Sequence, residues 1–165
     1  MTHPLSTLGI IHTVISLMPV LAGVYGFVRH GSIDPVTRSG KLYLFGLVLA
    51  VATSFTVSST GGLNPGHAFG IVVLLVAFGG VLVKRIGFLG RLRPYLSTFA
   101  LSFSFLLGLV PAVNESLTRL PAAHPLAAAP LSPVVLQTLL GCLVVFLVGF
   151  AAQGWMIHAR NRRME

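Results

Sequence analysis

Long apolar stretches alternate with short polar segments along the whole chain. Five of these stretches approach the roughly 20 residues needed to cross the hydrocarbon core of a bilayer. They cover residues 8–28, 42–59, 65–83, 95–113 and 133–157. The pattern predicts one all-α domain over residues 1–165, a polytopic transmembrane helix bundle of five spans.

Prolines at three places refine these boundaries. Asn64-Pro65 has the form of an N-cap followed by proline in the first helical turn, so the third helix is predicted to begin there. Pro133 is predicted to open the fifth helix in the same way. The segment 114–132 contains three prolines, which disfavour a long helix, and it is predicted to form an irregular outer loop over the bundle.

The composition agrees with a membrane location. Hydrophobic residues make up 55% of the chain and charged residues only 8%, with a mean hydropathy of +0.91. Soluble domains carry about a quarter charged residues. The single cysteine, Cys142, lies inside an apolar run and rules out a disulfide framework or a zinc cluster built on several thiolates.

The net charge of +8 reflects how the basic residues are distributed. Such a charge can indicate a nucleic-acid partner, but ten of the eleven Lys and Arg residues fall in short loops between spans or after the last span. These ten are Arg29, Arg38, Lys41, Lys84, Arg85, Arg91, Arg93, Arg160, Arg162 and Arg163. We therefore expect lipid rather than nucleic acid as the partner.

With five spans, all ten of these basic residues lie on one side of the membrane, and only Arg119 lies on the other. Basic residues in short loops mark the cytoplasmic side. The sequence thus predicts an outer N-terminus, a cytoplasmic C-terminus and a multi-pass protein of the bacterial inner membrane. Tyr25, Tyr43, Tyr95 and Trp155 are predicted to form an aromatic belt at the cytoplasmic interface.

Small and hydroxylated residues indicate where helices meet. Gly66 and Gly70 open the third span, and Gly23 and Gly26 lie in the first, where small side chains let helices approach closely. The outer half of the second span is rich in Ser and Thr, so we expect it to face protein or a wet cavity.

Two histidines, His12 and His67, lie within the outer ends of predicted spans. His12 is about five residues into the first span, roughly 7 Å along a helix, and His67 is in the first turn of the third. They are expected at similar depth. An ionisable residue inside a span is costly and indicates a function, a partner or both.

Neutral imidazoles from two helices can take both axial positions of a haem b, so His12 and His67 are candidate cofactor ligands. In the alternative, each histidine bonds a hydroxyl of the second span or caps a helix end. Another metal or a proton relay is a third possibility. Glu115 is expected to pair with Arg119 four residues later, or else to join His12, His67 or His124 around a metal ion or a quinone headgroup.

These residues resemble a known pattern over about residues 8–110. His12, the segment Gly23-Val24-Tyr25-Gly26, the basic segment from Arg38 through Lys41-Leu42-Tyr43, and His67 are similar to an uncharacterised group of predicted bacterial membrane proteins. That group in turn resembles transmembrane b-type cytochromes of the ascorbate-reducing kind, which hold two haems between alternate helices. The resemblance implies that His12 and His67 form the outer pair of ligands.

The inner pair of ligands is missing, because Thr37-Arg38 and Arg93-Pro94 stand where the resemblance places those histidines. The first hypothesis is therefore a redox or electron-transfer protein with one haem b near the outer face, exchanging electrons with a quinol. The second is a non-catalytic accessory subunit of a larger membrane complex or a homo-oligomer. The third is a metal-dependent membrane enzyme or transporter that uses His12, His67, His124 and Glu115.

Overall fold

The computed structural model describes residues 7–57, 64–121 and 124–163, and within them five helices are long and apolar enough to cross a membrane. The helices are α1 (Thr7–His30), α2 (Arg38–Ser54), α3 (Pro65–Val83), α4 (Arg93–Arg119) and α5 (Pro133–Arg162). Two short 3₁₀ helices, η1 (Phe55–Val57) and η2 (Gly87–Leu92), follow α2 and precede α4.

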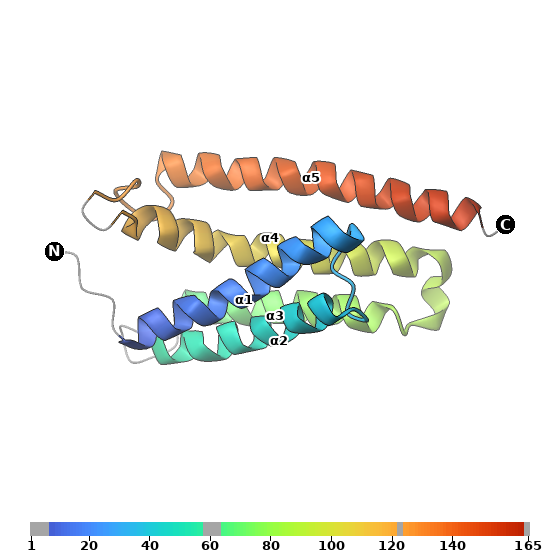
Figure 1. Ribbon diagram of the computed structural model, residues 1–165, viewed down its shortest axis with the longest axis horizontal. Helices are drawn as coiled ribbons and strands as arrows, with labels where there is room; N and C mark the ends of the chain where they lie inside the picture. The colour runs from blue at the N-terminus through green and yellow to red at the C-terminus, as the bar shows by residue number, and fades with distance from the viewer. Residues whose placement is uncertain (1–6, 58–63, 122–123, 164–165) are drawn as a thin grey trace.

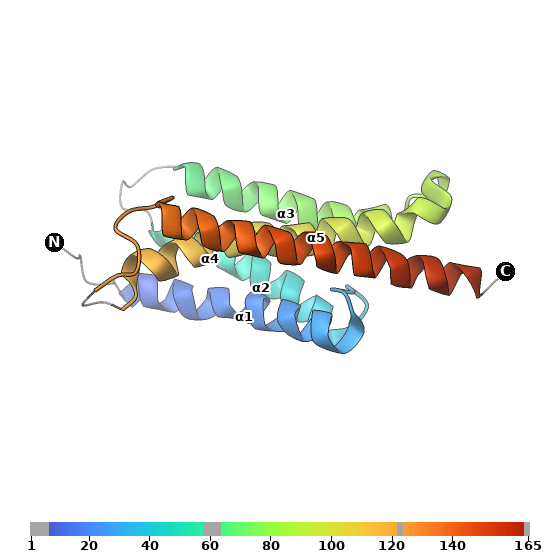
Figure 2. The same cartoon turned by 90° about the horizontal axis from the view of Figure 1, so that it is seen from above.

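The five helices run alternately in opposite directions along one axis (Figures 1 and 2). Packing is most extensive between α1 and α2, between α3 and α4, and between α4 and α5, whereas α2 and α3 touch much less. We call the end formed by the α1–α2 and α3–α4 connections and the C-terminal part of α5 the basic end. The opposite end, where α1, α3 and α5 begin, is called the far end.

The predicted spans and the observed helices agree best for the third, which covers 65–83 in both. The second helix begins four residues before the predicted span because Thr37 caps it, and positions 58 and 59 of that prediction lie outside the described residues. The fourth and fifth helices continue beyond their apolar stretches, to Arg119 and Arg162. A helix can extend past the hydrocarbon core, because backbone hydrogen bonding does not depend on hydropathy.

The predicted loop 114–132 is wrong in its first six residues, which belong to α4. The described residues after them fold back onto the end of that helix. Ala127 is buried and its N–H donates to the Leu117 carbonyl at 2.9 Å, while the Leu131 N–H donates to the Asn114 side-chain oxygen at 3.2 Å. This segment therefore covers the end of α4.

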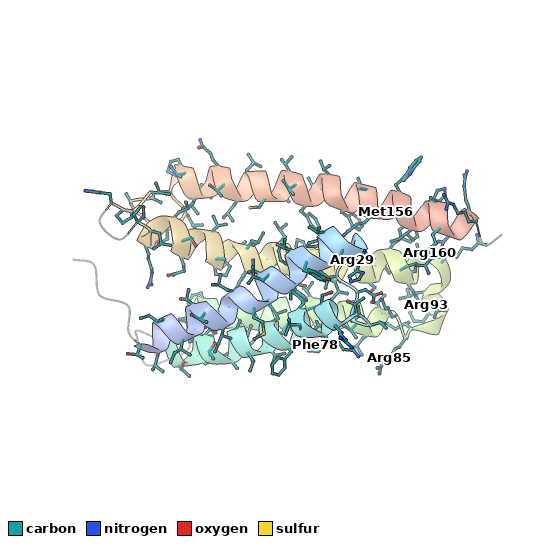
Figure 3. All side chains as sticks on the ribbon, viewed as in Figure 1. Arg29, Phe78, Arg85, Arg93, Met156 and Arg160 are labelled. Carbon is teal, nitrogen blue, oxygen red and sulfur yellow. The ribbon has the colours of Figure 1, made fainter. Side chains whose placement is uncertain are left out.

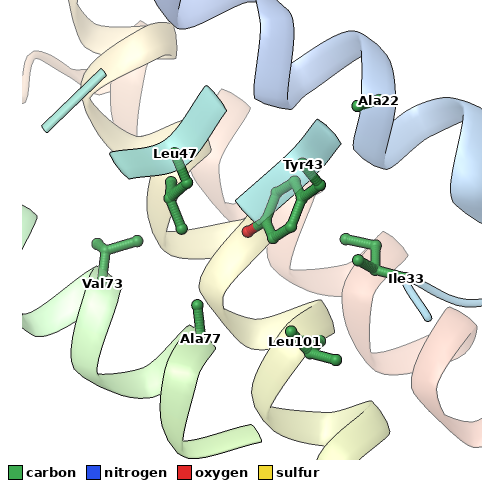
Figure 4. Packing of buried hydrophobic residues seen from close by; sticks show 7 residues of the cluster. All are labelled: Ala22, Ile33, Tyr43, Leu47, Val73, Ala77 and Leu101. Atoms are coloured by element: carbon green, nitrogen blue, oxygen red, sulfur yellow. The ribbon is translucent and has the colours of Figure 1, made fainter. Parts of the chain in front are cut away.

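A small hydrophobic core joins the first four helices (Figure 4). Its members are Ala22, Ile33, Tyr43, Leu47, Val73, Ala77 and Leu101. The prediction that Tyr43 belongs to an interfacial belt is wrong, since its side chain is only 1% exposed. The Tyr43 hydroxyl lies 2.8 Å from the Ser104 hydroxyl, and this hydrogen bond offsets the cost of burying a phenol.

Glycines mark the closest helix approaches, at some positions that the sequence suggested and at others that it did not. Gly23 faces the Phe105 ring of α4, and Gly70 faces Val51 of α2. Gly46 lies against Pro19 of α1, and Gly80 lies against Ala100 of α4. A methyl group at Gly46 or Gly80 would come within 2.9 Å of an atom on the neighbouring helix, so each glycine permits a contact that alanine would disturb.

The connection between α1 and α2 is held by polar contacts at its middle and at its second end. The Thr37 side chain accepts from the Gly40 N–H at 3.0 Å, which caps α2. Asp34 accepts from the Lys84 ammonium at 2.8 Å, so the connection is tied to the end of α3.

We expect this ion pair to make stability fall at low pH. Partial burial would raise the pKa of Asp34, but the Lys84 ammonium, the Val36 N–H and the charge of His30 together hold that pKa below its usual value of 3.8. A depressed folded-state pKa means that the stabilisation is complete above the unfolded value and is lost as pH falls through the folded one. Because both side chains are more than a third exposed, the effect should be at most about 1 kcal/mol.

The measurement is the unfolding temperature, recorded between about pH 6 and pH 3 in detergent. Asp34→Asn is the matched variant, because it keeps the shape of the side chain and cannot titrate. The wild type should lose more stability than this variant over the range. Equal losses in the two proteins would contradict the assignment.

Candidate functional site

His67 is a structural cap of α3 in this arrangement. Its ring is 4% exposed and stacks on the Phe55 ring, with 4.4 Å between the ring centroids. The Asn64 side chain accepts from the His67 N–H, and the Asn64 N–H donates to His67 Nδ1, both at 3.2 Å. The two residues therefore form a reciprocal capping box, with histidine in the position that Glu or Gln usually occupies.

The capping box fixes the proton on the His67 ring. A backbone N–H can only donate, so Nδ1 must be unprotonated. In the neutral ring the proton is then on Nε2, which lies 3.2 Å from the Ser54 carbonyl oxygen and donates to it. Both ring nitrogens of His67 are thus engaged, and neither has a lone pair free for a metal.

His12 is engaged less completely. Its Nδ1 lies 2.9 Å from the Thr53 hydroxyl oxygen, and that hydroxyl has the Leu49 carbonyl oxygen as its own acceptor at 2.8 Å. We infer that Nδ1 carries the proton and donates to Thr53. Among the residues that the structure describes, Nε2 then accepts from the Ser16 hydroxyl alone, at 3.4 Å, which is a long hydrogen bond. Nε2 of His12 is therefore the ring nitrogen most available to a ligand.

The two histidines meet the same end of α2 from different helices. His12 on α1 bonds Thr53, and His67 on α3 bonds the next residue, Ser54. The two contacts agree with the prediction that both histidines lie at similar depth. They also correspond to the alternative in which each histidine forms hydrogen bonds within the bundle or caps a helix end. The hydroxyls of the second span are engaged by protein where they are described, while Ser58, Ser59 and Thr60 lie outside the described residues.

The acidic and remaining histidine candidates are placed differently. Glu115 forms the predicted ion pair with Arg119, and its charge also acts on His12. His124 is exposed, and its backbone N–H donates to the Pro121 carbonyl at 3.1 Å. Among the described residues there is no group of three or more His, Cys, Asp or Glu side chains suited to hold a metal ion. A metal site formed by His12, His67, His124 and Glu115 stays a prediction.

One buried polar side chain that the sequence analysis did not single out connects three parts of the fold. Gln153 on α5 is 5% exposed, donates from Nε2 to the Gly31 carbonyl at 2.8 Å, and accepts from the Ser102 hydroxyl at 3.1 Å. It joins α5 to α4 and to the end of α1. The sequence feature that could have identified Gln153 is its amide side chain inside an otherwise apolar run, because a polar residue within a span is expected to find a hydrogen-bond partner.

Five helices long and apolar enough to cross a membrane define the class of a polytopic helical membrane protein, and several polar side chains join one of these helices to another. Compared with known proteins, the chain matches no family model, no curated protein and no solved structure. The resemblance to b-type cytochromes stays a prediction, and function has to be argued from the helices themselves.

Proposed function

We propose that this protein is a non-catalytic subunit of a larger assembly in the bacterial inner membrane, and that α5 is the helix that docks against another membrane protein. The observation that carries this proposal is the open surface of α5. Only 6% of the residues in its most apolar window are buried, against 22–28% for the other four helices. Among the described helices, α5 packs extensively against α4 alone.

The outward face of α5 carries three small residues at helical spacing, Thr138, Gly141 and Gly149, with Val145 between the two glycines. All four are exposed, and a methyl group built on either glycine would meet no atom within 4 Å. Glycine inside a helix costs about 0.5–1 kcal/mol relative to alanine. Against lipid alone this cost brings no benefit, whereas small residues let a second transmembrane helix approach closely. The glycines at Gly23, Gly46 and Gly80 already serve such contacts inside the bundle.

We also infer the orientation from the charges. Arg29, Arg85, Arg93 and Arg160 lie towards the same end of the bundle (Figure 3). Basic residues flanking spans are retained in the cytoplasm, so the basic end would be cytoplasmic and the N-terminus outside.

Site-specific crosslinking in native membranes tests the docking proposal. A photo-reactive residue at Val145, which is 73% exposed on α5, should give one discrete adduct with a different protein. The same residue at Leu75, 67% exposed on α3, is the matched control and should not give it. Gly141→Leu should abolish the Val145 adduct without lowering the unfolding temperature, because the glycine has open space around it.

Two results would count against docking to another protein. Equal and diffuse labelling from Val145 and Leu75 would mean that both positions face lipid. An adduct with the mass of two copies of this chain would instead assign α5 to a homo-oligomer.

Haem binding by His12 and His67 is the second candidate. It is favoured by the convergence of the two rings on Thr53 and Ser54 and by the weakly engaged Nε2 of His12. The fit is incomplete, because His67 would have to leave its capping box before it could ligate iron. We therefore derive no electron-transfer step through this group.

The visible spectrum, recorded before and after reduction with dithionite, tests whether the protein binds haem b. Protein produced with added haem should show a Soret band and a sharp reduced α-band if haem b is bound, and His12→Ala should lose both. Ser16→Ala is the control, since it removes only the 3.4 Å contact and leaves Nε2 of His12 in place. A colourless preparation under these conditions would contradict haem binding.

A further inference from the structure

A cavity of about 150 Å³ opens at the basic end, where the end of α1 meets α4 and α5. Its lining includes His30 and Ser32 from the end of α1 and the segment after it, Thr98 from α4, and Gln153, Met156 and Arg160 from α5. Met156 and Arg160 lie on the part of α5 near the basic end (Figure 3). Three segments that are distant in sequence thus build one cavity.

The wall of this cavity is held in place by buried hydrogen bonds. Gln153 is buried between the Gly31 carbonyl and the Ser102 hydroxyl, so it fixes α5 against the segment after α1. Ser102 is itself buried. A cavity whose wall is fixed in this way can present its side chains in a defined arrangement before a ligand arrives.

The cavity favours an anion. Arg160 brings a permanent positive charge, His30 can bring a second, and the hydroxyls of Ser32 and Thr98 can donate hydrogen bonds. No carboxylate lies among the residues that form its lining in the described part of the chain. The nearby Asp34 carboxylate is paired with the Lys84 ammonium at 2.8 Å. The guanidinium group is suited to phosphate oxygens, which it can bind with two parallel hydrogen bonds.

The size and position of the cavity restrict the class of ligand further. Ligand pockets for drug-sized molecules measure about 300–1,000 Å³, so a cavity of about 150 Å³ suits a small headgroup rather than a whole cofactor. Trp155 and Tyr25 are exposed near the same end, and such aromatic side chains mark the level of lipid headgroups. Met156 adds an apolar wall along which an acyl chain could leave.

We propose that this cavity binds a phosphate group, with Arg160 as its charged anchor and His30, Ser32 and Thr98 as further partners. Basic pockets between transmembrane helices on the cytoplasmic side bind the headgroups of anionic lipids. An anionic phospholipid is thus the expected source of the phosphate, and a soluble phosphate is the other source of the same chemistry. The proposal does not depend on the role of α5 in docking.

Thermal unfolding of the purified full chain tests the proposal. The protein in a non-ionic detergent is titrated separately with phosphatidylglycerol, phosphatidylcholine and inorganic phosphate. A ligand present at about 100 times its Kd should raise the unfolding temperature by about 5–10 °C. Phosphatidylglycerol should produce this rise and phosphatidylcholine should not.

Single substitutions test whether the rise in unfolding temperature comes from binding in this cavity. Arg160→Gln should abolish the rise, while Arg162→Gln, which removes the same charge two residues later and outside the cavity lining, should keep it. His30→Gln should reduce it and provides a second variant from a different helix.

Each outcome has a definite meaning. A rise with inorganic phosphate alone that depends on Arg160 would support the site and assign it to a soluble phosphate. The proposal is overturned if neither anion raises the unfolding temperature above the phosphatidylcholine level, or if Arg160→Gln and Arg162→Gln respond alike.

Discussion

Gly40→Ala should destabilise the protein by about 3 kcal/mol or more, near the upper end of what overpacking costs. The added methyl carbon would lie 1.9 Å from the Asp34 carbonyl oxygen and 2.4 Å from its carbonyl carbon. Both are backbone atoms, so no side-chain rotation can relieve the overlap. The connection between α1 and α2 would have to move, and its contact with Lys84 would be strained as well.

The unfolding temperature in detergent measures this effect, together with the yield of monodisperse protein. Gly79→Ala is the matched control, since a methyl group there would meet nothing within 4 Å and alanine favours a helix by about 0.5–1 kcal/mol. The control should be neutral or slightly stabilising. A Gly40→Ala protein as stable as the control would mean that the connection does not lie against α2.

Gln153→Leu should weaken the attachment of α5 to the rest of the bundle. The substitution leaves the buried Ser102 hydroxyl and the Gly31 carbonyl without their partner. Unpaired buried groups cost about 1–3 kcal/mol each, but hydrogen bonds between transmembrane helices often contribute less than 1 kcal/mol. We therefore expect a loss of about 1–3 kcal/mol.

Cys142, the single cysteine and itself part of α5, reports on this attachment. It is partly buried, so its alkylation by a maleimide in detergent should be faster in Gln153→Leu. Gln137→Leu is the control, because Gln137 is exposed on the same helix and its loss should change neither the rate nor the unfolding temperature. Equal alkylation rates in both variants would show that Gln153 does not hold α5.

Much of the helical arrangement could be predicted from local patterns. The start of α3 follows from Asn64 and Pro65, whose cap geometry depends on only a few neighbouring residues. The end of α4 could not be predicted in this way, because hydropathy indicates the extent of the apolar stretch and not the length of the helix. The Glu115–Arg119 pair supports one more turn, and the helix ends at Arg119, before Pro121.

The site was harder to predict because it depends on which helices are neighbours. The sequence placed His12 and His67 at similar depth and left hydrogen bonding and haem ligation as alternatives. Only the packing of α1 and α3 on α2 brings Thr53 and Ser54 to the two rings. Tyr43 could not be placed from the sequence for the same reason. Its position at the end of a span suggested an interfacial residue, but it is buried against Ser104, which is 61 positions away in the sequence.

The pairing of α1 with α2 and of α3 with α4 has a consequence for how the chain is made. Each pair closes around a short connection and shares far more contact within itself than α2 shares with α3. A nascent chain released from the ribosome should therefore partition into lipid as two successive hairpins. α5 follows both hairpins along the chain, and its hydrogen bond from Gln153 to Gly31 can form only after the first hairpin is in place.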